Sequence, residues 1–298
     1  MTVVAHAPVA LATPAAIRRK PTMGLLGWFG VAIVAAFAVL AVVAPSVSPY
    51  RTTELSGRPL EAPGADHLLG TNSVGQDVLS QLLSGARVSI VVAAVAGGGA
   101  VLVGALVGML AGWLGGGVDA VLMRFVDVVL VVPKVPLLIL VGSYAGPALG
   151  SIAVIIALTS WPPGARVVRS QVLSLRRRAH LKAATGFGAG TLHVLRHHVV
   201  PEIGLILAAG LVGTAGRAVM LEAGLAFLGL GDPSRASWGS MMRDALDFGV
   251  LFETDAWQWW LLPPLTAVSL LLLGMAFVGV GVEARLNPRL ARHYGSRR

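Results

Sequence analysis

Three ionisable side chains interrupt long apolar stretches of the sequence: Lys134, Arg217 and Glu222. A charged group inside a bilayer is costly unless protein or water surrounds it, so such residues often line a path for a solute. Lys134 could meet a carboxylate on that solute; the alternatives are an acidic partner on a neighbouring subunit or a side chain that extends to the interface. Arg217 and Glu222 lie about 140° apart around a helix, a poor direct pair. We take the three as candidate pathway residues, with a structural role as the alternative.

A second group of residues lies in the basic segment 170–202. Its spacing predicts two short helices, 171–184 and 190–199, with glycines between them and Pro201 ending the second. Such a pair could dock in a groove of a soluble partner and transmit its movement; a basic loop near anionic lipid headgroups is the alternative. His193 and His197 have the i, i+4 spacing of a metal clip, but no acidic or thiolate co-ligand accompanies them, so we expect a solvated face.

Motifs for nucleotide or metal chemistry are absent from the sequence. It contains no GxxxxGK(S/T) phosphate loop, no HExxH motif and no cysteine. The protein therefore does not hydrolyse ATP with a P-loop of its own, and it has no thiolate metal site or disulfide scaffold. We expect no catalytic residue, no cofactor and no metal ion in this chain.

The elements that must position these residues are apolar helices. Of the 298 residues, 55% are hydrophobic and 12% are charged, against about 25% charged in soluble proteins. Because so few charges cannot cover a water-facing surface, we predict an all-α membrane protein. Uncharged runs of about 20 residues are long enough to span a bilayer, and Gly146-Pro147 divides one of them. Six spans are predicted, at 23–44, 88–112, 121–144, 148–167, 203–230 and 258–282.

The distribution of charge predicts how these helices are oriented. Lysine and arginine gather before the first span, in 166–202 and after the last span, whereas 45–87 and 231–257 carry more acids than bases. By the positive-inside rule both termini are cytoplasmic. The formal net charge of +9 therefore indicates membrane orientation and contact with lipid rather than a nucleic-acid partner. Gly104, Gly108 and Gly112 stack on one helix face, a pattern typical of close helix packing.

Five stretches, in order along the chain, resemble motifs of ABC-importer permeases of the DppC/OppC type, which serve dipeptide, oligopeptide and nickel importers. The stretches are 67–80 (HLLGTNSVGQDVLS), 119–133 with its Met123-Arg124 and Asp127, 182–201, 227–239 (FLGLG, then SWG) and 286–290 (LNPRL). The resemblance runs in register from about residue 23 to 290.

The stretch 182–201 resembles the EAA loop that contacts the ATPase subunits in this family. The matching positions are Lys182, Ala183, Ala184, Gly188, His198 and Pro201. Lys182 stands where the family has an acid, so either the partner has compensated or neighbours such as Gly188 carry the contact. Gln76 and Asn287 replace an arginine and an aspartate of the other motifs.

The resemblance implies a type I (MetI-like) fold with six spans in the inner membrane. It also implies a second homologous permease, two P-loop ATPase subunits or domains that bind ATP and Mg²⁺, and an external substrate-binding protein. That protein would face Asp232, Trp238 and Asp244. The resulting division is a cytoplasmic tail 1–22, a first span 23–44, an external segment 45–87, a core 88–284 with loops 170–202 and 231–257, and a basic cytoplasmic tail 285–298.

The sequence leaves two classes of function open. The first is an importer subunit that couples partner ATP hydrolysis to alternating access, for peptides or for nickel complexes and other small solutes. The second is a stand-alone ion-coupled secondary transporter, which would need buried relays or internal repeats. The sequence shows three intramembrane charges and no obvious repeat, which favours the importer.

Overall fold

The computed structural model describes residues 23–145 and 148–286, so the tails predicted at 1–22 and beyond 286 lie outside the described residues. Every regular element in that range is a helix. The elements are α1 (Leu25–Val47), α2 (Val78–Val92), α3 (Gly98–Leu114), α4 (Gly116–Val131), α5 (Lys134–Ala145), α6 (Leu149–Ser160), α7 (Pro162–Arg176), α8 (Ala179–Gly186), α9 (Thr191–Val194), α10 (Val200–Phe227), α11 (Trp238–Leu246), α12 (Trp257–Trp260) and α13 (Leu262–Leu286). π-helical turns Ala93–Gly97 and Leu195–Val199 join α2 to α3 and α9 to α10, and a 3₁₀ turn, Leu251–Glu253, precedes α12.

Within the described residues, four helices are long and apolar enough to cross a membrane: Leu25–Val47, Val78–Leu114, Thr191–Phe227 and Trp257–Arg285. Two further pairs meet that test only together. The α4–α5 pair is bent by 81° and the α6–α7 pair by 42°, which gives up to six spans if each pair counts as one. Prolines explain both bends, because Pro133 precedes α5 and Pro162 begins α7, and a proline ring cannot continue the preceding helix without a clash.

The second span begins ten residues earlier than the sequence predicts, at Val78 rather than 88. The Asp77 carboxylate caps this end by accepting hydrogen bonds from the Ser80 backbone N–H and hydroxyl, both at 2.7 Å. A capped start stabilises a polar first turn that apolar content alone would not indicate. The end of the predicted external segment 45–87 is therefore helical.

Close packing between spans depends on glycine. Gly104, Gly108 and Gly112 of α3 face α7, and a Cβ at these positions would lie 2.9, 2.5 and 2.9 Å from carbonyl oxygens of that helix and of its N-cap residue, Trp161. The predicted packing role of this stripe is confirmed. A second glycine contact joins α1 to α13, where the Cβ of a residue replacing Gly30 would lie 2.6 Å from the Gly274 carbonyl oxygen.

Ion pairs explain the acidic residues of the stretch 119–133. The Asp119 carboxylate of α4 accepts two hydrogen bonds from the Arg169 guanidinium of α7, at 2.5 and 2.6 Å. Eight residues further on, Asp127 accepts one from Arg166 at 2.5 Å. The bidentate Asp119–Arg169 pair fixes orientation as well as distance. Because the residue numbers rise along α4 and fall along α7, the two pairs hold these helices side by side and antiparallel.

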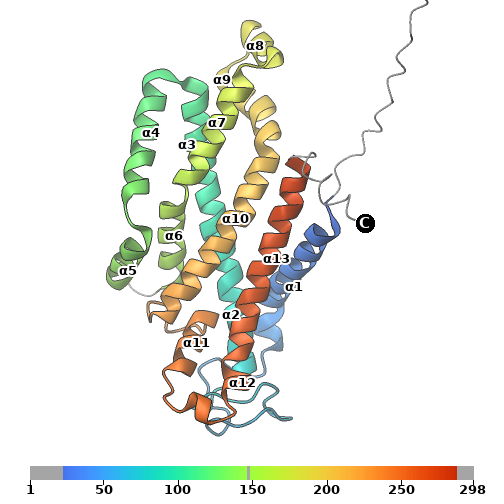
Figure 1. Ribbon diagram of the computed structural model, residues 1–298, viewed down its shortest axis with the longest axis vertical. Helices are drawn as coiled ribbons and strands as arrows, with labels where there is room; N and C mark the ends of the chain where they lie inside the picture. Colours follow the sequence, from blue (N-terminus) through green and yellow to red (C-terminus); the bar gives the residue numbers. More distant parts are fainter. Residues whose placement is uncertain (1–22, 146–147, 287–298) are drawn as a thin grey trace, which may run out of the picture.

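The polar segments collect at two opposite ends of the bundle (Figure 1). One end, here the α8 end, carries α8, α9 and the turn between α3 and α4. The other, the α11 end, carries α11, α12 and the irregular segment 48–77. The candidate functional residues lie at these two ends and between them.

Candidate functional site

At the α8 end, residues 177–199 form a lever that projects beyond the helix bundle (Figure 1). Its inner side is apolar: Leu181, Val194 and Val199 are buried against Val172 of α7 and Ile203 of α10. Its outer side is open, with Lys182 and Ala183 exposed and the Phe187 and Leu192 side chains 93% and 78% exposed. The lever is therefore anchored on one side and free to contact a partner on the other.

Gly188 ends α8 in a specific backbone conformation. Its φ is +86°, a left-handed value, and its N–H donates to the Thr185 carbonyl at 3.1 Å. The next N–H, of Ala189, donates to the Ala184 carbonyl at 3.0 Å. These two bonds define a Schellman motif, in which glycine is favoured because it has no Cβ. The glycine of the predicted loop therefore sets the turn between the two halves of the lever.

Glu202, a residue that the sequence analysis did not select, ties the lever to α10. Its two carboxylate oxygens accept hydrogen bonds from Arg178 at 2.7 Å and from His180 at 2.9 Å. Both donors stand at the start of α8, and Glu202 lies in the first turn of α10. No periodicity signals such a contact, because its partners are more than twenty residues apart and meet only in the folded chain.

Two sequence predictions about the lever are wrong. The predicted helix 171–184 is divided, because α7 ends at Arg176 and α8 starts at Ala179. Pro201 does not end a short helix but lies in the first turn of α10, inside one helical span from Thr191 to Phe227. Helix is tolerated there because the wide π turn Leu195–Val199 relieves the clash between the proline ring and the preceding turn. Of the other predicted residues, Ala184 and His198 are partly exposed on the lever.

The three intramembrane charges divide into two environments. Glu222 is buried, with 3% exposure, and its Oε2 atom lacks a hydrogen-bond partner among the described residues. Arg217 is exposed on another side of α10 and donates to the Thr214 hydroxyl at 3.2 Å. Lys134 begins α5 and donates to the Ser160 hydroxyl at 3.2 Å. Arg217 and Glu222 do not pair, as their spacing predicts.

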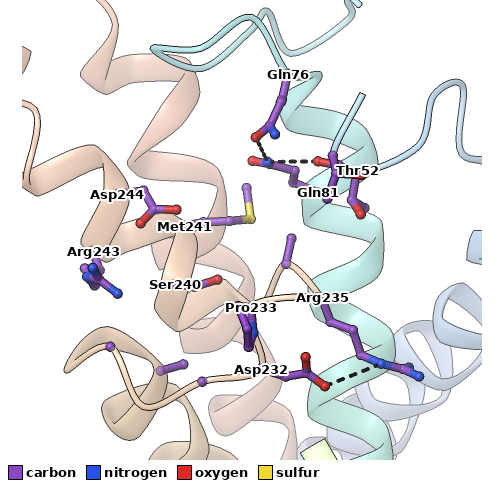
Figure 2. Close-up of a pocket in the computed structure, with 15 residues that line it drawn as sticks. Thr52, Gln76, Gln81, Asp232, Pro233, Arg235, Ser240, Met241, Arg243 and Asp244 are labelled. Carbon is purple, nitrogen blue, oxygen red and sulfur yellow. Dashed lines mark hydrogen bonds and ion pairs between the residues drawn. The ribbon is translucent and has the colours of Figure 1, made fainter. Parts of the chain in front are cut away.

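At the α11 end, a polar hollow of about 310 Å³ lies between segment 52–81 and segment 226–244 (Figure 2). Gln76 is part of its wall and accepts hydrogen bonds from Gln81 at 2.8 Å and from Asn72 at 2.9 Å. Gln81 also donates to the Thr52 carbonyl at 3.2 Å. Gln76, which replaces the arginine of the family motif, therefore has hydrogen-bond partners for its side-chain oxygen in this local network.

The three residues predicted to face a binding protein lie in three different environments. Asp244 is exposed at the hollow. Asp232 accepts hydrogen bonds from Ser234 and from the Leu149 N–H at 3.2 Å, which ties the start of α6 to the loop before α11. Although burial acts in the opposite direction, these hydrogen bonds hold the pKa of Asp232 below its usual range.

Trp238 does not face a partner, so this prediction is wrong for its side chain. It is 1% exposed, donates its indole N–H to the Leu82 carbonyl at 3.0 Å and packs edge-on against Phe37 at 5.5 Å. Gly85 of α2 leaves the space that the indole ring fills. The SWG motif thus serves as a packing anchor beneath α11.

A buried His–Asp pair holds segment 48–77 against α2. The His67 Nδ1 atom lies 3.0 Å from the Asp77 Oδ1 atom, and the two side chains are 3% and 1% exposed. The hydrogen bond to Asp77 raises the pKa of His67, while burial opposes the shift. Since the pKa is raised, the pair adds stability below about pH 6.5, the value for an unfolded histidine.

This stability should be lost as the pH rises through the raised pKa of His67. We expect the melting temperature of the wild type to exceed that of His67→Gln most at pH 6 and least at pH 9, measured in one detergent. Comparing the two proteins at each pH cancels changes that they share. A difference that stays constant from pH 6 to 9 would contradict the protonated pair.

Comparisons with known proteins decide the family. A family model described as "Binding-protein-dependent transport system inner membrane component" matches residues 104–292, well over half of the chain. The chain belongs to this family. The permease is accordingly a multi-pass inner-membrane protein of the ABC-importer class, and its fold is MetI-like.

Full-length relatives give the branch. The dipeptide transport system permease protein DppC of Bacillus subtilis is 33% identical over 277 residues, covering 92% of the permease and 85% of the relative. The DppC protein of Alkalihalophilus pseudofirmus is 32% identical over 265 residues, covering 88% and 85%. A candidate peptide permease of Brucella suis biovar 1 is 35% identical over 263 residues, covering 88% and 86%. The DppC/OppC-type assignment is therefore confirmed.

Proposed function

We propose that this permease is the translocation subunit of a peptide importer and converts ATP hydrolysis in partner subunits into alternating access of a transmembrane path. In this proposal the two bent helix pairs each cross the membrane once, which makes six spans with both termini in the cytoplasm. The chain itself is not an enzyme. ATP and Mg²⁺ are bound by two ATPase subunits or domains, and a second homologous permease completes the path.

The observation that carries the proposal is the lever. Phe187 and Leu192 are large apolar side chains held in the open at the α8 end, although an exposed apolar patch in water is unfavourable. The lever is anchored by a buried apolar cluster and by the Glu202 ion pairs. Such a rigid element can fit a groove on the ATPase and pass its closing movement to α7 and α10.

Charge supports the orientation. The α8 end carries the basic runs, among them Arg176, Arg177 and Arg178, and this excess of basic residues supports a cytoplasmic position for that end. The α11 end carries the acidic segment 231–257 and the hollow beside Asp244, and it would receive the substrate-binding protein outside. Peptides are proposed as cargo because the relatives carry names of peptide and dipeptide permeases.

Affinity purification of this chain in mild detergent, with its genomic neighbours co-expressed, tests the proposal. We expect a second permease and P-loop ATPases to co-purify with it, and vanadate to inhibit ATP hydrolysis by the complex. The chain Phe187→Asp should lose the ATPases, whereas Phe187→Leu should keep them because it preserves an apolar contact. Recovery of the wild-type chain alone in several detergents would favour a transporter that works without ATPases.

A further inference from the structure

Two broken spans meet at Lys134. The residue begins α5 directly after the 81° bend, and Ser160 ends α6 directly before the 42° bend. The Lys134 ammonium donates to the Ser160 hydroxyl at 3.2 Å, so the two breaks touch through polar side chains. In transporters, discontinuous helices typically mark solute sites, because the ends of the half-helices carry partial charges on unpaired backbone groups that can face the path.

The depth of this junction places it inside the membrane. Sixteen residues of α4 precede it, which corresponds to roughly 24 Å of helix at about 1.5 Å per residue. On the other side, the twelve residues of α6 give roughly 18 Å. Both lengths fall short of the roughly 30 Å of the hydrocarbon core, so the junction lies between the two membrane surfaces.

A second cation lies on the adjoining helix α10. Lys134 is one turn before Leu138 and Arg217 directly precedes Ala218, and Leu138 and Ala218 belong to one buried cluster, so the two like charges lie on packed helices and repel each other. Within residues 23–145 and 148–286 no carboxylate lies within 4 Å of either cation. Two uncompensated positive charges in a membrane interior are unfavourable unless water or an anion reaches them.

The face of α10 that carries Arg217 is open. Gly210, Gly213, Arg217, Met220 and Gly224 recur every three or four residues and are all exposed. A Cβ added at Gly210 or Gly224 would meet nothing within 4 Å. Because an arginine is strongly disfavoured against lipid tails, we expect this face to meet water or protein rather than the bilayer.

We propose that Lys134 and Arg217 form an anion site in the path, which receives a carboxylate of the transported solute. Arginine binds a carboxylate with paired N–H donors and lysine adds a point charge, so both residue types suit this group. Glu222 takes no part, since it is buried away from the open face. The inference rests on the proposed function, because it requires a solute that passes this point.

Cysteine labelling tests the site directly, since the chain contains no cysteine of its own. The Arg217→Cys variant is studied in the complete complex in lipid nanodiscs, with and without ATP and vanadate. It is treated with one of two methanethiosulfonate reagents, an anionic sulfonatoethyl or a cationic trimethylammonium-ethyl derivative. Mass spectrometry of this chain reports the rates. We expect the anionic reagent to react about tenfold faster, because a local positive potential concentrates anions.

Two control variants locate the cause. Gly210→Cys lies two turns away on the same face and should show a ratio several-fold smaller. Adding Lys134→Gln to Arg217→Cys should reduce the ratio to that of Gly210→Cys. Equal rates, or no reaction with either reagent, would overturn the site, the latter because lipid or the second permease seals it. A faster reaction with the cationic reagent would also overturn the site, because it would show that an acid of the second permease already pairs with the two cations.

A protection measurement identifies the anion. Tri-alanine at millimolar concentration should slow anionic labelling of Gly213→Cys, a variant that keeps both cations and whose Cβ would lie 3.7 Å from the Arg217 Nη1 atom, whereas the C-terminal amide of tri-alanine should not. Equal effects of the two peptides would overturn the carboxylate assignment. Labelling does not require transport, so the two proposals can fail separately. If the complex hydrolyses ATP but lacks this labelling pattern, only the anion site is refuted. If the chain shows the pattern but binds no ATPase, only the importer proposal is refuted.

Discussion

Gly188→Val should release the ATPase subunits from the permease. The residue holds a φ of +86°, where a side chain costs about 1–2 kcal/mol and a β-branched one more. Loss of the Schellman turn would separate α8 from α9 and misplace Phe187. We expect ATPase recovery in co-purification, and vanadate-sensitive hydrolysis, to fall about tenfold, since 1.4 kcal/mol changes an equilibrium tenfold.

The matched control is Gly188→Asn, because asparagine tolerates the left-handed region better than other side chains. It should keep most of the ATPase while changing the same position. Both variants should enter the membrane and elute as wild type, since a Cβ at position 188 meets nothing within 4 Å. Valine with wild-type ATPase recovery would refute the role of this turn in docking.

Gly108→Val should destabilise the folded permease itself. The valine Cβ would lie 2.5 Å from the Ala165 carbonyl oxygen and 2.8 Å from the Val168 Cβ, and the backbone of α7 cannot yield locally. Overpacking costs roughly 1–3 kcal/mol and occasionally more, and a contact with backbone puts this site at the upper end of that range. In a thermal melt of the detergent-solubilised protein this corresponds to a fall on the order of 10 °C.

Gly98→Val serves as its control, because Gly98 begins the same helix and a Cβ there meets nothing within 4 Å. The two substitutions add the same side chain to α3 and differ only in what it would meet. A comparable fall for both variants would show that glycine at position 108 matters for helix propensity and not for contact with α7.

The sequence alone predicted those features that depend on the composition or spacing of residues close together in the chain. The excess of apolar residues predicted a helical membrane protein, and the 3.6-residue period placed Gly104, Gly108 and Gly112 on one packed face. Five motifs in order predicted the DppC/OppC type that the comparisons confirm. Gly188 was selected by motif, and its left-handed turn gives the physical reason for a glycine there.

Bends and partners required the tertiary structure. Hydropathy averages over a window, so it merged α4 with α5 and could not measure the 81° bend at Pro133. The resemblance implied that Trp238 faces a binding protein, although the space left by Gly85 buries that ring. Such contacts join residues far apart in the chain, and no pattern of neighbours encodes them.

The division follows from the range of the interactions involved. Composition, helical period and charge asymmetry are properties of short segments, so the sequence by itself determined the membrane class, the approximate spans and the family. The bonds of Glu202 to Arg178 and His180, and the bond of Lys134 to Ser160, depend on how separate helices pack. Only the tertiary structure could bring those charges together, because side-chain electrostatics act over a few ångströms in space and not along the chain.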